Sequence, residues 1–173
     1  SMQKTWKGAA CGLALLMAAA SADADLVQLS FTGNNDLVGT FIIDLDTPDS
    51  DPVDQDAGSY EDAFTVTGLT VSSSAYTGGS DFDISIDNDF FGLDQFSFRA
   101  TGGIWDGAPV AGFEMLLQDA TAGAIDTDGL DQLMAGNLGP DDFGNMQFFL
   151  LVDDGFTLES MIDDFTITEV PEP

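Results

Sequence analysis

The chain has 173 residues, 44% of them hydrophobic, and its 31 acidic residues against three basic ones give a net charge of −28. Nucleic acid and anionic lipid headgroups are excluded as partners, because binding either requires Lys and Arg to displace counterions. The chain is nonetheless too apolar for a disordered acidic tail, and about 150 residues suit one globular domain.

Residues 1–24 are interpreted as an expression scar, Ser1, followed by a signal peptide. Lys4 and Lys7 precede an apolar run over 8–20, and small residues at 20–24 supply the cleavage pattern. The run is shorter than the roughly 20 residues that span a bilayer. Cleavage after Ala22 leaves Arg99 against 31 acidic residues, a net charge of −30, and no cysteine. The mature exported chain is therefore expected to hold together without disulfides and without contacting a membrane itself.

Apolar residues alternate with polar ones along the mature chain, which predicts an all-β fold, an antiparallel β-sandwich of jelly-roll-like type with acidic loops, over residues 25–168. The run 146–152 is nearly continuous and predicts a central strand covered on both faces. One helical turn is expected at Leu130–Ala135, covering an open end. The eight predicted strands span 26–31, 37–43, 64–71, 81–87, 95–100, 112–118, 146–152 and 163–170.

Asp outnumbers Glu by 26 to 5. Because Asp is a poor helix and strand former, this excess favours turns and short-range coordination by carboxylate oxygens. The segment 44–56 combines Asp with prolines that cannot donate ladder hydrogen bonds, and it is predicted to be a loop. Calcium takes six to eight oxygens in irregular geometry, and no cluster here completes an EF-hand pattern. A hydrated surface suited to salty water explains the same residues, so both interpretations stand. The candidate calcium ligands are Asp44, Asp46, Asp49 and Asp51; Asp87, Asn88 and Asp89; and Asp126, Asp128 and Asp131.

The chain contains no His, and its mature part contains no Cys or Lys, which excludes a Ser-His-Asp triad, a thiol nucleophile, a Schiff base and a His-containing zinc site. A pair of carboxylates could still hydrolyse glycosides, with Glu61, Glu114 and Glu159 as candidate acids, but nothing singles out a pair. We therefore expect no enzyme. Arg99 could clamp a carboxylated ligand; the simpler expectation is an ion pair with neighbouring aspartates.

Three aromatic residues are candidates for stacking on sugar rings, because they lie beside Gly or acidic turn residues: Tyr60, Tyr76 and Trp105. Trp105 could instead fold back to plug an end of the sandwich. The Phe residues occupy alternating positions and are assigned to the core.

The chain ends in Val170-Pro171-Glu172-Pro173, preceded by the strand-like run 162–169, and carries the Asp-rich run 39–51. These segments resemble the PEP-CTERM sorting signal, and ectodomain sequence associated with it, in exported proteins of Gram-negative bacteria. The resemblance implies an exosortase-type processing enzyme as partner, a transmembrane helix and basic cluster after the motif, and residence at the cell surface or in the extracellular matrix, commonly in bacteria that make exopolysaccharide. Residues 169–173 are then the start of the sorting tail. Alternatively, Pro-Glu-Pro is simply an extended terminus.

These observations together predict a non-enzymatic, exported cell-surface or extracellular-matrix protein, with Ca²⁺ as the one candidate cofactor. The first alternative is a carbohydrate-binding module for exopolysaccharide. The second is a carboxylate glycosidase.

Overall fold

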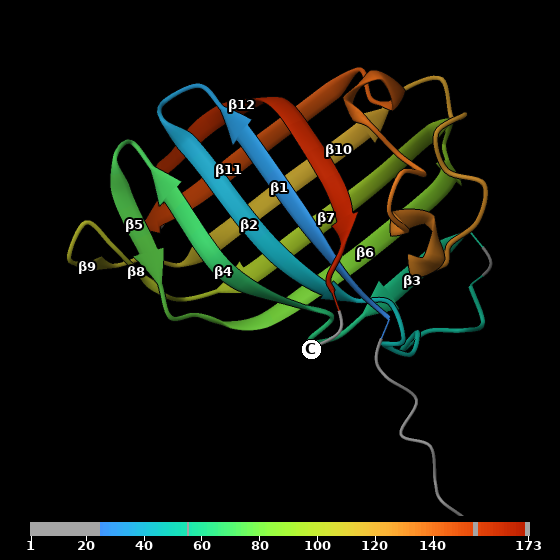
Figure 1. Ribbon diagram of the computed structural model, residues 1–173, viewed down its shortest axis with the longest axis horizontal. Helices are drawn as coiled ribbons and strands as arrows, with labels where there is room; N and C mark the ends of the chain where they lie inside the picture. The colour runs from blue at the N-terminus through green and yellow to red at the C-terminus, as the bar shows by residue number, and fades with distance from the viewer. Residues whose placement is uncertain (1–24, 55, 154–155, 172–173) are drawn as a thin grey trace, which may run out of the picture.

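The computed structural model describes residues 25–54, 56–153 and 156–171 (Figure 1). The predicted signal peptide and the last two residues of the proposed sorting motif, Glu172 and Pro173, lie outside the described residues.

Every strand pairing is antiparallel, and the strands form one continuous sheet in the order β3-β6-β7-β10-β11-β12-β1-β2-β4-β5-β8-β9. All eight predicted strands are present, joined by four short ones that the sequence did not indicate. The bounds are β1 Leu26–Gly33, β2 Leu37–Asp44, β3 Ala57–Tyr60, β4 Phe64–Val71, β5 Ser74–Thr77, β6 Ser80–Phe90, β7 Leu93–Thr101, β8 Ile104–Trp105, β9 Ala108–Pro109, β10 Gly112–Asp119, β11 Asn145–Asp153 and β12 Phe156–Glu169.

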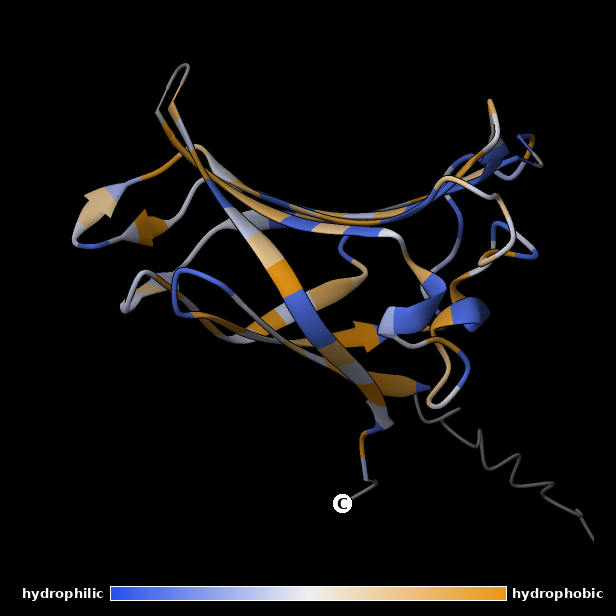
Figure 2. Ribbon diagram, turned by 90° about the horizontal axis from the view of Figure 1, so that it is seen from above, coloured by the Kyte–Doolittle hydropathy of each residue, from blue (hydrophilic) through white to orange (hydrophobic). Residues whose placement is uncertain are grey.

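The long strand β12 folds this sheet into two layers. Its first half pairs with β11, where Met161 lies opposite Gln147, and its second half pairs with β1, where Phe165 lies opposite Phe31. The first layer contains β1, β2, β4 and β5, and the second contains β3, β6, β7, β10 and β11; Figure 2 shows β12 crossing between them. The all-β antiparallel sandwich is thus confirmed, in the form of a curled half-barrel.

The strand order refines the jelly-roll-like description. A jelly roll is built from Greek keys, in which a fourth strand returns to lie beside the first of its group. Here β1, β2, β4 and β5 are neighbours in chain order, and so are β6, β7, β10, β11 and β12, while β3 joins the edge of the second layer beside β6. Apart from β3, each layer is therefore a meander.

Phenylalanine rings from both layers meet in the core. Phe41 stacks on Phe113 with ring centroids 5.6 Å apart, and Phe64 meets Phe98 edge-on at 5.7 Å. Such pairs contribute about 0.5–1.5 kcal/mol each beyond the burial of their area. Packing of the two layers therefore stabilises a domain whose described residues contain no cysteine.

The prediction that the strand at 146–152 is covered on both faces is wrong, because β11 is covered on one face only. Phe148 and Leu150 are fully buried between the layers, whereas Phe149 and Leu151 point to the other side and are only partly buried. The apolar run misled because no further layer covers the outer face of the second layer (Figure 2).

The predicted helical turn is a 3-10 helix, η1 Leu130–Leu133, which buries Leu130 and Leu133 at one end of the sandwich (Figure 1). A second short helix, η2 Pro140–Asp142, follows it. Asp44, the first residue of the predicted Asp-rich loop, is the last residue of β2 and pairs with Leu26. The described residues that follow it, 45–54 and 56, connect β2 to β3 without strand pairing, which confirms a loop there.

Candidate functional site

In the densest predicted calcium cluster, Asp44 to Asp51, two carboxylates accept hydrogen bonds from nearby backbone N–H groups. Asp44 Oδ1 accepts from the Asp46 backbone N–H at 3.0 Å, and Asp49 Oδ1 accepts from the N–H groups of Asp51 and Ser59 at 2.9 and 3.0 Å. These are the short-range bonds that make Asp a turn residue. They hold the loop against the start of β3.

The second cluster, Asp87, Asn88 and Asp89, lies on β6 near the end of the strand. Asp87 accepts from the Gln95 amide, and Asp89 has a left-handed backbone (φ 54°). Burial raises the pKa of the Asp87 carboxyl, an effect that Arg99 opposes and Asp54 reinforces.

The third cluster, Asp126, Asp128 and Asp131, lies where residues 126–131 run into η1, and the Asp128 carbonyl accepts from the Tyr60 hydroxyl at 2.7 Å. Across the described part of the chain, no three His, Cys, Asp or Glu side chains stand in an arrangement suited to a metal ion. Calcium binding by any of the three clusters stays a prediction.

The predicted sugar-stacking aromatics occupy interior positions. Tyr60 and Tyr76 are 5% and 4% exposed, so neither ring offers a free face, and the expectation for these two residues is wrong. Burial and the nearby Asp49 and Asp128 raise the pKa of Tyr60 to about 12, and burial raises that of Tyr76. Trp105 is partly buried, and its indole N–H donates to the Val71 carbonyl at 3.0 Å, as expected for a tryptophan folded back onto the sandwich.

Arg99 forms an ion pair with Glu114 rather than with an aspartate. Its Nη2 and Nε lie 2.8 and 3.0 Å from Glu114 Oε1, which also accepts from Ser97 Oγ at 3.1 Å. Glu159, another candidate acid, accepts from Gln147 Nε2 at 2.8 Å, and Glu61 follows β3 at an exposed position.

A ladder of amide side chains, not predicted from the sequence, lies on the outer face of the second layer. Gln118 Nε2 donates to Gln95 Oε1, Asn145 Nδ2 donates to Gln118 Oε1 at 2.7 Å and to Gln147 Oε1 at 3.1 Å, and Gln95 donates to Asp87 at 3.3 Å. With Glu159 at its far end, this amide ladder crosses β6, β7, β10, β11 and β12. The available signal was the parity of the strands, because Gln95, Gln118 and Gln147 each lie next to a buried apolar residue, namely Phe96, Leu117 and Phe148.

Two inward-facing aspartates were also missed. Asp94 is fully buried and joins two segments, accepting from the Asp89 N–H and the Ile125 N–H, both at 2.8 Å. Asp119 lies opposite it on β10. The backbone N–H and hydroxyl of Thr121, and the N–H of Gly123, hold the pKa of Asp119 below its ordinary value. Both break the apolar alternation of their strands, which is the signal that could have revealed them.

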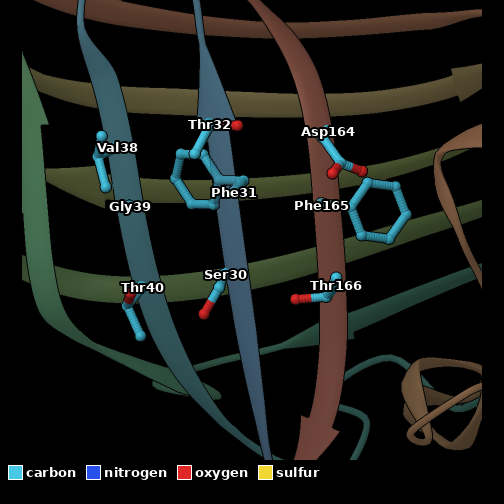
Figure 3. A pocket seen from close by; sticks show the side chains of 9 residues that line it. All are labelled: Ser30, Phe31, Thr32, Val38, Gly39, Thr40, Asp164, Phe165 and Thr166. Carbon is cyan, nitrogen blue, oxygen red and sulfur yellow. The ribbon is translucent and has the colours of Figure 1, made fainter.

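The outer face of the first layer carries several hydroxyls beside a single described glutamine, Gln28. In the pocket of Figure 3, Ser30 lies between Thr40 on β2 and Thr166 on β12, with Asp164 and Val38 nearby. Phe31 and Phe165 close its floor, because their rings belong to the core.

Comparisons with protein families, with curated proteins and with solved structures found no match for this chain. Within the described residues, no helix combines the length and apolar character needed to cross a membrane.

Proposed function

We propose that this chain is a non-enzymatic protein exported to the cell surface or extracellular matrix through a PEP-CTERM-type signal. One structural observation supports it: the two ends of the domain lie together. The Val170 N–H donates to the Leu26 carbonyl at 3.1 Å, and Glu169 lies opposite Val27 (Figure 1).

This arrangement suits a tethered domain. A tail continuing from Val170 would leave the sandwich beside the point where the leader is removed, so a single end would face the membrane. The outer faces of both layers would then point to the surroundings. A net charge of −30 would keep such a domain hydrated and separate from its neighbours, and Ca²⁺ bound by the Asp loops is part of this proposal.

The test is to fractionate the cells that produce the protein and to determine which fraction contains it. Mass spectrometry of the isolated protein then identifies its N- and C-terminal residues. We expect the surface or extracellular fraction, an N-terminus at Asp23 or Asp25, and a C-terminus processed near Val170. Replacing residues 170–173 with alanines in the native gene should leave the precursor unprocessed. An intact leader in the cytosolic fraction, or unchanged processing of the alanine variant, would contradict the proposal.

The absence of catalysis is tested separately, with polysaccharides and a reducing-end assay. A carboxylate glycosidase would release new reducing ends, and replacing Glu114 or Glu159 by Gln would stop their release. We expect no release from the unmodified protein.

A further inference from the structure

The amide ladder is a preorganised hydrogen-bonding surface. Each amide supplies two N–H donors and a carbonyl with two lone pairs. Gln118 and Gln147 each donate one N–H within the ladder, and among the described residues their second N–H has no acceptor. Neighbours fix the orientation of these side chains, so a ligand would not have to order them, which lowers the entropic cost of binding.

The composition of this face differs from that of the rest of the chain. Three of the five glutamines in the described residues lie in the ladder, although the chain carries 26 Asp that serve as its usual surface residue. Glu114 is neutralised by Arg99, the only cation of residues 25–171. The ladder ends in two carboxylates, Asp87 and Glu159, which accept from Gln95 and Gln147. Its middle is uncharged although Asp is available elsewhere, which indicates a ligand without charge, and the acidic ends disfavour an anionic one.

Apolar side chains lie beside the amides. Leu116, Phe149 and Leu151 point outward and are partly buried, and Phe149 lies in register between Glu114 on β10 and Glu159 on β12. Alternating apolar and hydrogen-bonding groups match a sugar, whose ring presents C–H faces and whose rim presents hydroxyls. Binding sites generally combine apolar lining with a few placed polar groups.

The shape of the face favours a polymer. The second layer is curved with its outer side concave (Figure 2). The ladder crosses four interstrand spacings, roughly 19 Å at about 4.8 Å each, which exceeds the length of a single sugar. Anionic polymers and a second copy of this chain are disfavoured, because the rest of the molecule repels negative charge.

We propose that the outer face of the second layer, from Gln95 across Gln118 and Phe149 to Glu159, binds an uncharged polysaccharide. This site replaces the aromatic one expected from the sequence. It goes beyond the proposed function, because an exported protein could carry this face without binding anything, and a binding failure would leave the processing experiment unaffected.

The binding test uses the full chain in affinity electrophoresis and calorimetry at about 0.15 M NaCl. The probes are uncharged hydroxyethylcellulose, xylan, galactomannan and dextran, with alginate as the anionic comparison. We expect at least one uncharged polymer to bind and alginate not to bind. Binding of alginate alone, or of none of the five polymers, would overturn the proposal.

Two variants locate the site. The Q118A/Q147A pair should weaken binding at least tenfold, whereas Gln28→Ala should change it less than twofold, because Gln28 donates to Ser30 on the outer face of the first layer. Circular dichroism establishes that each variant is folded. Equal weakening by both changes, or by neither, would place binding elsewhere.

A second measurement needs no substitution. In NMR spectra of ¹⁵N-labelled protein, the side-chain NH₂ signals of Gln95, Gln118 and Gln147 should shift when the bound polymer is added, and those of Gln28 and Gln132 should not. Gln132 is a matched internal control, because it is buried in η1, where its side chain donates to the Thr127 hydroxyl and accepts from the Asp126 N–H. Unshifted ladder signals in the presence of a bound polymer would overturn the assignment.

Discussion

At the end of the sandwich that η1 covers, the Asp94 side chain ties the end of β6 to the loop at Ile125. In Asp94→Ala the N–H groups of Asp89 and Ile125 would lose this partner, and the Ile125 N–H lies at a buried position, where an unpaired group costs about 1–3 kcal/mol. We expect urea unfolding to show a fall of about 1–3 kcal/mol in the free energy of unfolding. Asp163→Ala, at an exposed position of β12, is the control and should change it by less than about 0.5 kcal/mol. Similar small effects of the two changes would show that Asp94 is not a structural tie.

Asp119 predicts a dependence on pH with a defined sign. Its pKa is lowered on folding from the ordinary 3.8 by hydrogen bonds from Thr121 and Gly123. A carboxyl with a depressed folded pKa contributes stability above its unfolded pKa and loses it as the pH falls through the folded pKa. Asp119→Asn should therefore lower the melting temperature at pH 7, and the difference from the unmodified chain should shrink below about pH 4. A difference that stays constant from pH 7 to pH 2 would contradict this.

Single residues also show where sequence patterns stop being informative. Tyr60 and Tyr76 lie beside turn residues, which suggested exposure, but neighbouring segments cover their rings, and their hydroxyls donate to the Asp128 and Gly102 carbonyls. The partner of Arg99 likewise depends on strand register, which places Glu114 directly opposite it. Long-range register is set by the whole sheet, so it could not be read from local spacing.

At the scale of elements, the crossover of β12 depends on close backbone approach at Gly33. A Cβ there would lie 2.1 Å from the Met161 carbonyl oxygen, at the point where β12 changes partner from β11 to β1. Gly33→Ala should force the two strands apart and reduce the free energy of unfolding by about 1–3 kcal/mol or more. Gly68→Ala on β4 is the matched control, since its Cβ would meet nothing within 4 Å, and it should be neutral or stabilising by up to about 1 kcal/mol. Thermal unfolding of both variants measures the difference in stability between them. Equal losses of stability would mean that the strands move apart at Gly33 at little cost.

Period-two alternation predicted the eight main strands because each buries one face against the other layer. It found only the second half of β12, since the first half places a polar Ser160 at a buried inward position, where its hydroxyl meets the Asn35 amide at 3.3 Å. The short strands β3, β5, β8 and β9 have two to four residues each, too few for a periodic signal. The amide ladder was missed for a related reason: Gln95, Gln118 and Gln147 are far apart in sequence, and only strand order brings them together.

For the whole molecule, negative charge dominates the response to solution conditions. The chain has a net charge of −28, so its like charges repel. Salt screens that repulsion over a Debye length near 10 Å at about 0.1 M. The melting temperature should therefore rise with NaCl even if no ion binds at a specific site. Such a rise is the result expected if the aspartates serve only as a hydrated, mutually repelling surface. A melting temperature that does not change with NaCl would contradict that interpretation.

Calcium separates the two interpretations of the acidic loops. If Asp44–Asp51, or either other cluster, binds the ion in the folded state only, millimolar Ca²⁺ stabilises the chain by mass action, by about 2.7 kcal/mol at a concentration one hundred times Kd. We expect a melting temperature several degrees above that in NaCl of matched ionic strength. Magnesium at the same concentration is the charge control, because Mg²⁺ demands octahedral geometry and retains its waters. Replacing Asp46 and Asp51 by Asn should remove the excess if the first loop holds the ion. Equal melting temperatures in calcium, magnesium and matched NaCl would leave the loops as a hydrated surface and remove Ca²⁺ from the proposed function.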